Sequence, residues 1–123
     1  MATENADGGF ALLNDSKYGH RAKNGLISLN LLRAPTYPDP TADRGSHHFR
    51  YAFTPFASGD LPKVIREGYR LNNPLIHAPG VELASAASTS DPGVIIETVK
   101  GAESGSGIVL RLYESLGLSL IHI

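Results

Sequence analysis

The pattern of apolar and polar side chains along the chain predicts several β-strands. Residues 47–55 alternate most clearly, with aromatic side chains at positions 49, 51 and 53 on one face. Residues 26–33 also alternate, although both faces of that segment carry leucine. Residues 10–14, 94–100 and 108–114 are apolar runs of strand length. Together these segments predict a mainly β fold.

Turn residues indicate how the predicted strands pair. Asn24-Gly25 is a dipeptide that tolerates positive φ and commonly reverses a β-hairpin. We therefore expect residues 10–14 to pair with residues 26–33. The glycine-rich segment 101–107 joins the last two strands into a second hairpin, and it lacks the Lys-Ser/Thr pair and the following helix of a phosphate loop.

A single helix is predicted after Asp60, which can cap it, with Pro62 in its first turn and Asn-Asn-Pro at 72–74 ending it. An apolar stripe runs along this helix: Leu61, Val64, Ile65 and Tyr69. We expect the stripe to pack in the core rather than to bind a partner. Residues 76–93 form a connector rich in Pro, Gly, Ala and Ser, and residues 1–9 are expected to form a flexible arm.

The segment 34–40 is the first candidate binding site. Its prolines at positions 35, 38 and 40 exclude a helix and an interior strand, so it is a stiff loop. Tyr37 and Asp39 lie on this loop and Arg33 at its foot, which combines a donor, an acceptor and a flat apolar face, as ligands such as sugars require. An alternative stays open, in which Arg33 pairs with a nearby carboxylate and Tyr37 packs on a sheet edge.

Composition excludes several classes of function. The chain is 41% apolar and 19% charged with net charge −1, which allows at most one globular domain. Its 11 basic residues are scattered among 12 acidic ones, so we expect no nucleic acid and no membrane as a partner. Because the sequence has no cysteine, no apolar leader and no run of membrane-spanning length, we expect a cytoplasmic protein.

The titratable residues predict no catalytic and no metal site within the chain. Asp15 and Asp39 are the tempting carboxylate pair, but the predicted hairpin separates them by about 20 Å, against about 5 Å in a retaining glycosidase. His47 and His48 are adjacent in a predicted strand and therefore point to opposite faces. The other histidines have no metal-ligating residue at suitable spacing in the same element.

Several blocks of sequence carry a resemblance to a known family. They are FALLNDSKYG at 10–19, LLRAPTYPD at 31–39, YRLNNPL at 69–75, VIIETVK at 94–100 and IVLRLYE at 108–114. In this order they resemble the C-terminal β-domain of α-mannosidases of glycoside hydrolase family 38, in the branch found in bacteria and fungal vacuoles. The resemblance covers residues 10–117, while residues 118–123 depart from it and suggest a tail that is not native.

The resemblance implies an antiparallel β-sandwich of the galactose-mutarotase-like (supersandwich) type with one short helix, of which this chain holds an incomplete part. It implies a parent enzyme that hydrolyses terminal α-mannosides with retention, using an Asp nucleophile and a zinc ion on a catalytic barrel. The motifs of that barrel are absent from this sequence. We therefore expect no cofactor in this chain, packing on the barrel, marginal stability of the uncovered sheet, and no activity without the barrel.

In such enzymes the β-domain closes over the barrel, which makes Arg33, Tyr37 and Asp39 candidates for the rim of the sugar pocket. The second-choice candidates precede the predicted turn: Asn14, Asp15, Lys17 and Tyr18. Two alternatives stay open. The chain is a stand-alone, non-catalytic carbohydrate-binding β-sandwich module, or it is a purely structural domain that stiffens the enzyme or its oligomer interface.

Overall fold

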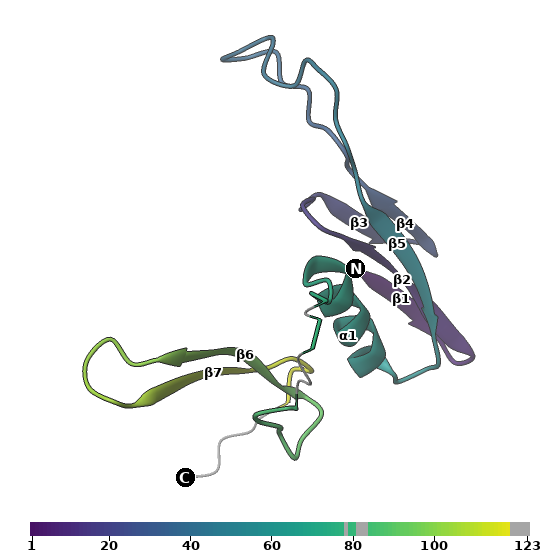
Figure 1. Ribbon diagram of the computed structural model, residues 1–123. Coiled ribbons are helices and arrows are strands. Elements are labelled where there is room, and N and C mark those ends of the chain that lie inside the picture. Colours follow the sequence, from purple (N-terminus) through teal and green to yellow (C-terminus); the bar gives the residue numbers. More distant parts are fainter. Residues whose placement is uncertain (78, 81–83, 119–123) are drawn as a thin grey trace. The chain divides into compact units, whose positions relative to one another are not determined.

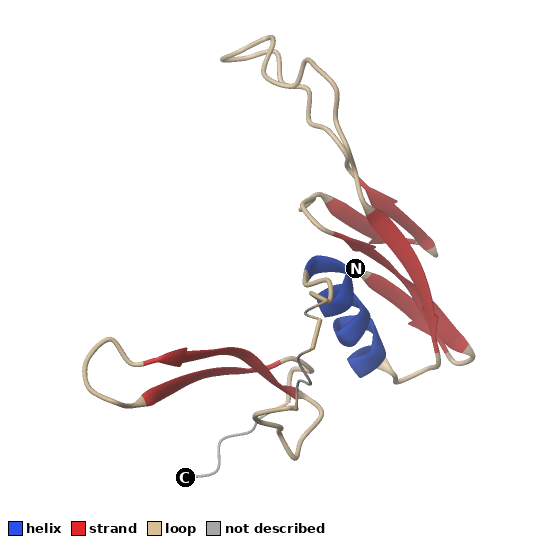
Figure 2. Cartoon of the chain, in the orientation of Figure 1, coloured by secondary structure: helices blue, strands red, loops and turns tan. Residues whose placement is uncertain are grey.

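The chain forms two structural units, Met1–Leu75 and Ile76–Ile123, in the computed structural model of Figure 1. The structure describes residues 1–77, 79–80 and 84–118. All strand pairs of these residues are antiparallel, and a single helix accompanies them (Figure 2). The predicted mainly β fold with one short helix is confirmed, and the arrangement is consistent with an incomplete β-sandwich.

A three-stranded sheet forms the centre of the first unit. Its strand order is β1 (Ala2–Asn5), β2 (Gly8–Asn14) and β5 (Tyr51–Phe56). β2 is the middle strand, and its Leu12 lies opposite Phe53 of β5. Both edges of β2 are therefore hydrogen-bonded, which makes this strand the fixed element from which the following loop starts.

Two predictions for this sheet are wrong. Residues 2–5 form β1 where a flexible arm was expected, because Asn5 Oδ1 accepts hydrogen bonds from the backbone N–H groups of Asp7 (3.0 Å) and Gly8 (3.2 Å). This turn folds β1 back onto β2. As a result β2 pairs with β1 and β5 rather than with residues 26–33. Backbone pairing does not need apolar side chains, so the polar segment gave no sign of a strand.

A second, two-stranded sheet consists of β3 (His20–Lys23) and β4 (Leu26–Leu29). The predicted turn between them is confirmed, because Asn24 and Gly25 have φ angles of 52° and 75°, the positive values of a two-residue hairpin turn. Such a turn joins the segments directly beside it. The alternating pattern therefore predicted the strand at β4 but assigned it the wrong partner.

The helix α1 (Leu61–Asn72) follows β5 and is confirmed in its position and its cap. Asp60 Oδ1 accepts a hydrogen bond from the backbone N–H of Lys63 at 3.2 Å, which satisfies a free donor of the first turn. The strand predicted at residues 47–55 begins only at Tyr51, the first residue of β5. Residues 47–50 belong instead to the end of the preceding loop.

The core of the first unit lies between the sheet and one side of α1. Its buried members and the residues packed on them are Ala11, Leu13, Phe56, Ala2, Ala52, Val64 and Leu71. Val64 comes from the predicted helical stripe, and Leu71 joins it from a later turn. Because α1 has no fully buried residue, it covers the sheet as a surface helix.

The second unit contains the hairpin of β6 (Val94–Gly101) and β7 (Ile108–Glu114), as predicted. The described residues of the connector 76–93 contain no helix or strand. Residues 78 and 81–83 of that connector, and 119–123 of the expected non-native tail, lie outside the described residues. In the part of the chain that is described, no helix is long and apolar enough to cross a membrane.

Candidate functional site

The second-choice rim residues lie together in the loop between β2 and β3, which we call the Asn14 loop (residues 14–18). The Asn14 side chain organises it: Oδ1 accepts hydrogen bonds from the backbone N–H groups of Ser16 and Lys17, and Nδ2 donates to Nε2 of His20 at 2.8 Å. A side chain that bonds its own following backbone is typical of an Asx turn. Asn14 therefore holds the loop in shape.

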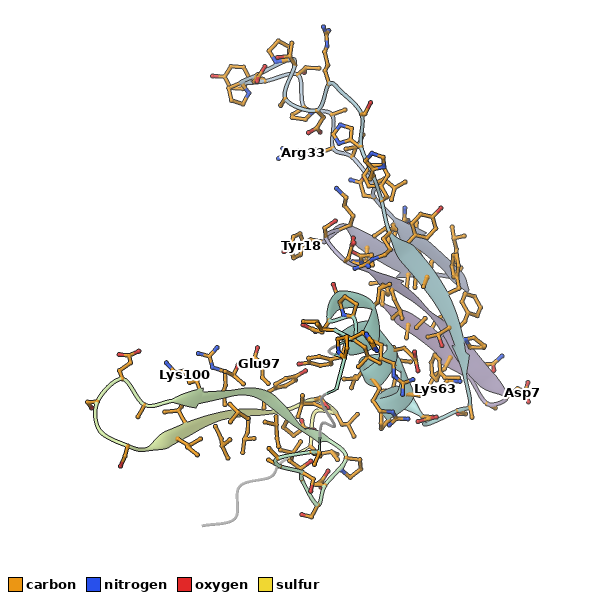
Figure 3. The ribbon with its side chains drawn as sticks, in the orientation of Figure 1. Asp7, Tyr18, Arg33, Lys63, Glu97 and Lys100 are labelled. Atoms are coloured by element: carbon orange, nitrogen blue, oxygen red, sulfur yellow. The ribbon has the colours of Figure 1, made fainter. Side chains whose placement is uncertain are left out.

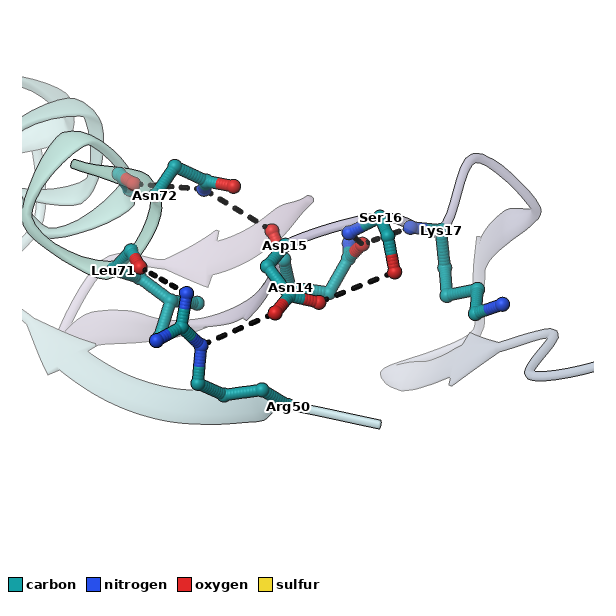
Figure 4. A network of polar contacts seen from close by, with 8 residues as sticks. Asn14, Asp15, Ser16, Lys17, Arg50, Leu71 and Asn72 are labelled. Atoms are coloured by element: carbon teal, nitrogen blue, oxygen red, sulfur yellow. Dashed lines mark hydrogen bonds and ion pairs between the residues drawn. The ribbon is translucent and has the colours of Figure 1, made fainter. Parts of the chain in front are cut away.

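Arg50 and Asn72 join the Asn14 loop to two other elements (Figure 4). Arg50 Nε donates to Asp15 Oδ2 at 3.1 Å, and a second nitrogen of Arg50 donates to the carbonyl of Leu71 at 2.8 Å. Asn72 Nδ2 donates to the carbonyl of Asn14 at 3.2 Å. Each partly exposed contact contributes at most about 1 kcal/mol, but together they fix the loop against the last turn of α1.

A small cleft of about 210 Å³ opens at this loop. Its lining residues come from the loop and from the end of α1: Asn14, Asp15, Ser16, Lys17, Tyr18 and Asn72. Ligand pockets usually measure about 300–1,000 Å³, so this cleft is smaller than a typical ligand pocket. The Tyr18 side chain is 95% exposed, while Lys17 Nζ lies 4.9 Å from the ring centre of Phe49 in a cation–π contact.

The first-choice residues lie on a different loop, residues 33–43, which we call the proline loop. Asp39 Oδ1 accepts hydrogen bonds from the backbone N–H and the hydroxyl of Thr41, at 2.8 and 2.7 Å. Hydrogen bonds to the charged form lower the pKa of Asp39, the backbone bond most and the hydroxyl bond next. Asp43 Oδ2 closes the loop by accepting from the N–H of Ala34 at 2.6 Å. Asp39 is thus an ionised turn residue.

Unlike Asp39, whose side chain is hydrogen-bonded within the loop, Arg33 and Tyr37 have exposed side chains. The Tyr37 side chain is 86% exposed, so it does not pack on a sheet edge as the structural alternative assumed. Arg33 is also exposed, and within the described part of the chain it forms no hydrogen bond or ion pair. These two side chains are therefore free to meet a ligand without breaking a contact of the described fold.

The two loops present their side chains at separate places (Figure 3). Arg33 lies at the protruding proline loop, and Tyr18 lies beside the β2–β3 connection. Asp15 and Asp39 belong to different hydrogen-bond networks, one centred on Arg50 and the other on Thr41. The structure thus brings the residues of the Asn14 loop together at one cleft and places Arg33, Tyr37 and Asp39 on another loop, so the two sets do not share that cleft.

Two of the described histidines, His20 and His47, take part in local contacts. His20 bonds Asn14 and lies 3.2 Å from the carbonyl of Tyr18, while His47 Nε2 donates to the carbonyl of Asp43 and its ring stacks on Phe49. Among the described residues, no three His, Cys, Asp or Glu side chains form a group that could hold a metal ion. These residues do not fit the zinc centre that the resemblance implies for a catalytic barrel.

Sequence reasoning missed Arg50 and Asn72 as parts of this site. Arg50 meets Asp15 across 35 positions, and Asn72 meets Asn14 across 58. No local pattern marks such distant pairs in a single sequence. The sequence marks Asn72 only as a residue that ends the helix, although its amide also supports the Asn14 loop.

The fold defines the chain as β-rich, with antiparallel sheets and one helix. Its candidate binding residues lie on two exposed loops, the Asn14 loop and the proline loop. A family model described as "Glycosyl hydrolases family 38 C-terminal domain" matches residues 1–41. The chain is 48% identical over 118 residues to "Alpha-mannosidase 2C1" of Homo sapiens, a match that covers 89% of this chain and 11% of that protein. The chain is therefore similar to the C-terminal domain of this glycosyl hydrolase family.

Other relatives agree with this result. The chain is 45% identical over 120 residues to "Alpha-mannosidase G" of Dictyostelium discoideum, with 90% of this chain and 11% of that protein covered. It is 35% identical over 128 residues to "Alpha-mannosidase" of Saccharomyces cerevisiae, with 89% and 12% covered. The chain thus spans about one ninth of the length of these relatives. No solved structure matches the chain.

Proposed function

We propose that this chain is part of an α-mannosidase that hydrolyses terminal α-mannosides with retention of configuration. The longer polypeptide that carries the chain is called the parent enzyme below. One observation carries the proposal: the chain is 45–48% identical to curated α-mannosidases across about 90% of its length. In the parent enzyme a catalytic barrel outside this chain supplies the nucleophile and holds the zinc ion, and this chain packs on that barrel.

Arg33 and Tyr37 are the proposed contribution of this chain to the rim of the sugar pocket. The Arg33 guanidinium can donate hydrogen bonds to sugar hydroxyls or to a carboxylate of the barrel, and the Tyr37 ring can stack on a pyranose face. Both side chains are exposed on the proline loop. Asp39 assists indirectly, because its bonds to Thr41 shape the turn that follows Tyr37.

The Asn14 loop is the second proposed rim. Tyr18 offers an exposed ring, whereas Asn14 and Lys17 are engaged by neighbouring groups and the Asp15 carboxylate already accepts hydrogen bonds from Arg50 and Ser16. Because the network with Arg50 and Asn72 fixes this loop, it would present Asp15 and Tyr18 in one orientation. The absence of cysteine from the sequence fits a reducing compartment, so we also propose a cytoplasmic location for the parent enzyme.

Comparing the 123-residue chain with the parent enzyme in an α-mannosidase assay tests this function. With an aryl α-mannoside as substrate, we expect turnover by the parent enzyme and none by the chain alone. Proton NMR of the first-formed mannose distinguishes retention from inversion. Turnover by the chain alone, or a parent enzyme without α-mannosidase activity, would contradict the proposal.

A non-catalytic carbohydrate-binding module is the second candidate function. The exposed rings of Tyr18 and Tyr37 favour it, since sugar-binding surfaces use such rings as stacking platforms. Titration of the chain with mannose or mannobiose, followed by NMR, separates the two functions. Saturable binding by a well-folded monomer supports a stand-alone carbohydrate-binding module. A poorly folded chain that binds neither sugar supports the proposal that the chain is part of an α-mannosidase.

A further inference from the structure

Ala34, which follows Arg33 in the proline loop, has an unusual backbone conformation. Its φ angle is 47°, in the left-handed region that residues with a side chain rarely adopt. Pro35 comes next, and a residue before proline favours extended geometry with φ of about −120°. Because the local sequence favours a different conformation, a contact from elsewhere in the chain has to hold Ala34 in place.

Asp43 supplies this contact. Its Oδ2 atom accepts a hydrogen bond from the backbone N–H of Ala34 at 2.6 Å. The chain returns toward Ala34 through a turn in which the N–H of Arg44 donates to the carbonyl of Thr41 at 3.0 Å. Hydrogen bonds from a backbone N–H to a carboxylate are among the stronger ones in proteins, so this bond can offset the strain at Ala34.

The backbone of Asp43 is held by a second set of contacts. Its carbonyl accepts a hydrogen bond from Nε2 of His47 at 2.9 Å, and the His47 ring stacks on Phe49. Phe49 is half-buried, and its ring also carries Lys17 of the Asn14 loop. Asp43 therefore connects Ala34, through its side chain, to contacts that reach the Asn14 loop.

The conformation of Ala34 sets the directions of Arg33 and Tyr37 relative to each other. Residues 34–36 separate the two, and Pro35 restricts its own φ. Because both side chains are exposed, packing contributes little to their orientation. A change of φ at Ala34 to the extended value would turn Arg33 through a large angle relative to Tyr37.

We propose that Asp43 is a positioning residue for Arg33. By holding Ala34 in the left-handed conformation, Asp43 keeps Arg33 and Tyr37 in one arrangement at the rim. The inference rests on the proposed function, since it assumes that these two side chains meet the sugar. Asp43 acts by raising the fraction of molecules whose loop is ready to bind, and the apparent affinity for a ligand falls in proportion to that fraction.

Asp43→Ala in the parent enzyme tests this role. Without the acceptor, Ala34 should return to extended geometry in most molecules, and kcat/KM should fall about tenfold. Asp43→Asn keeps an oxygen that can accept from the Ala34 N–H, so it should lose much less. Asp7→Ala is the control, because the exposed Asp7 carboxylate forms no hydrogen bond or ion pair within the described residues. Equal kcat/KM in Asp43→Ala and Asp7→Ala would overturn the proposal.

Combined variants separate positioning from a general loss of stability. Since Asp43 acts through Arg33, Asp43→Ala should cause little further loss of kcat/KM in an enzyme that already carries Arg33→Ala. Glycine adopts positive φ without strain, so adding Ala34→Gly to Asp43→Ala should raise kcat/KM about threefold or more, beyond the effect of Ala34→Gly alone. Fully additive losses, or no recovery with glycine, would contradict a positioning role.

Hydrogen exchange at the Ala34 amide tests the contact independently of activity. Residue-resolved mass spectrometry of the parent enzyme should show exchange about tenfold faster in Asp43→Ala than in wild type or Asp7→Ala. Equal exchange in all three proteins would refute the inference. Should Arg33→Ala leave kcat/KM unchanged, the proposed rim fails, and the exchange result alone decides whether Asp43 holds Ala34.

Discussion

The Asn14 loop and the proline loop carry similar polar and aromatic side chains but are held by different means. Bonds from the Asn14 loop reach Arg50 and Asn72, 35 and 58 residues away. In the proline loop, the bonds of Asp39 and Asp43 span two and nine residues. One loop is fixed to a sheet and a helix, whereas the other is shaped by its own turns and projects from the first unit (Figure 3).

This difference separates side chains that hold the fold from side chains that are available to a ligand. Asn14 and Asp39 each bond a nearby backbone N–H, so their replacement should change loop structure first. Arg33 and Tyr37 make no such bond within the described residues, so their replacement should change binding first. The contrast between the loops can therefore be measured as stability in one case and as activity in the other.

The largest effect is expected from Arg33→Ala in the parent enzyme. Loss of charged hydrogen bonds to the sugar or to a barrel carboxylate should lower kcat/KM by about 10- to 100-fold, since such bonds contribute about 1.5–3 kcal/mol. The melting temperature should stay unchanged. Arg44→Ala is the matched control, because Arg44 is another exposed arginine in the segment between β4 and β5. An unchanged kcat/KM for Arg33→Ala would instead support a purely structural domain.

Local signals in the sequence predicted much of the fold. The cap at Asp60 located α1, the Asn24-Gly25 pair located a turn, and apolar runs located β6 and β7. Each of these features depends on residues within one turn or one strand. Pairing between distant segments was predicted wrongly, because β1 is polar and nothing in its sequence shows that it borders β2.

The candidate site was predictable to a similar degree. Proline spacing showed that the segment around Tyr37 is an exposed loop, and the structure agrees. The roles of Asn14 and Asp39 as loop-holding residues depend on hydrogen bonds two and three positions ahead, which turn chemistry suggests but does not require. The contact of Arg50 with Asp15 depends on the position of β5, which no local pattern fixes.

A medium effect is expected from Asn14→Ala, which tests the fixed loop. Removing the acceptor of two backbone N–H groups should destabilise the loop locally by about 1–2 kcal/mol. Hydrogen exchange at the amides of Ser16 and Lys17 in the parent enzyme measures this as faster exchange. Asn30→Ala is the control, because Asn30 is exposed and its side chain forms no hydrogen bond within the described residues. Equal exchange in both variants would mean that Arg50 and Asn72 alone hold the loop.

The smallest effect is expected from protonation of Asp39, which tests the self-contained loop. Hydrogen bonds from Thr41 lower the pKa of Asp39 below its ordinary value of 3.8, so the charged form is favoured in the folded loop. The stabilisation is therefore complete above the ordinary pKa and is lost as the pH falls through the lowered pKa. NMR titration should show the Asp39 carboxyl and the Thr41 amide changing together, with a midpoint below 3.8. In Asp39→Asn the Thr41 amide should show no such transition. A midpoint at or above the ordinary value would show that the turn does not persist in solution, and the proline loop would then lack the fixed shape on which the roles of Arg33 and Tyr37 depend.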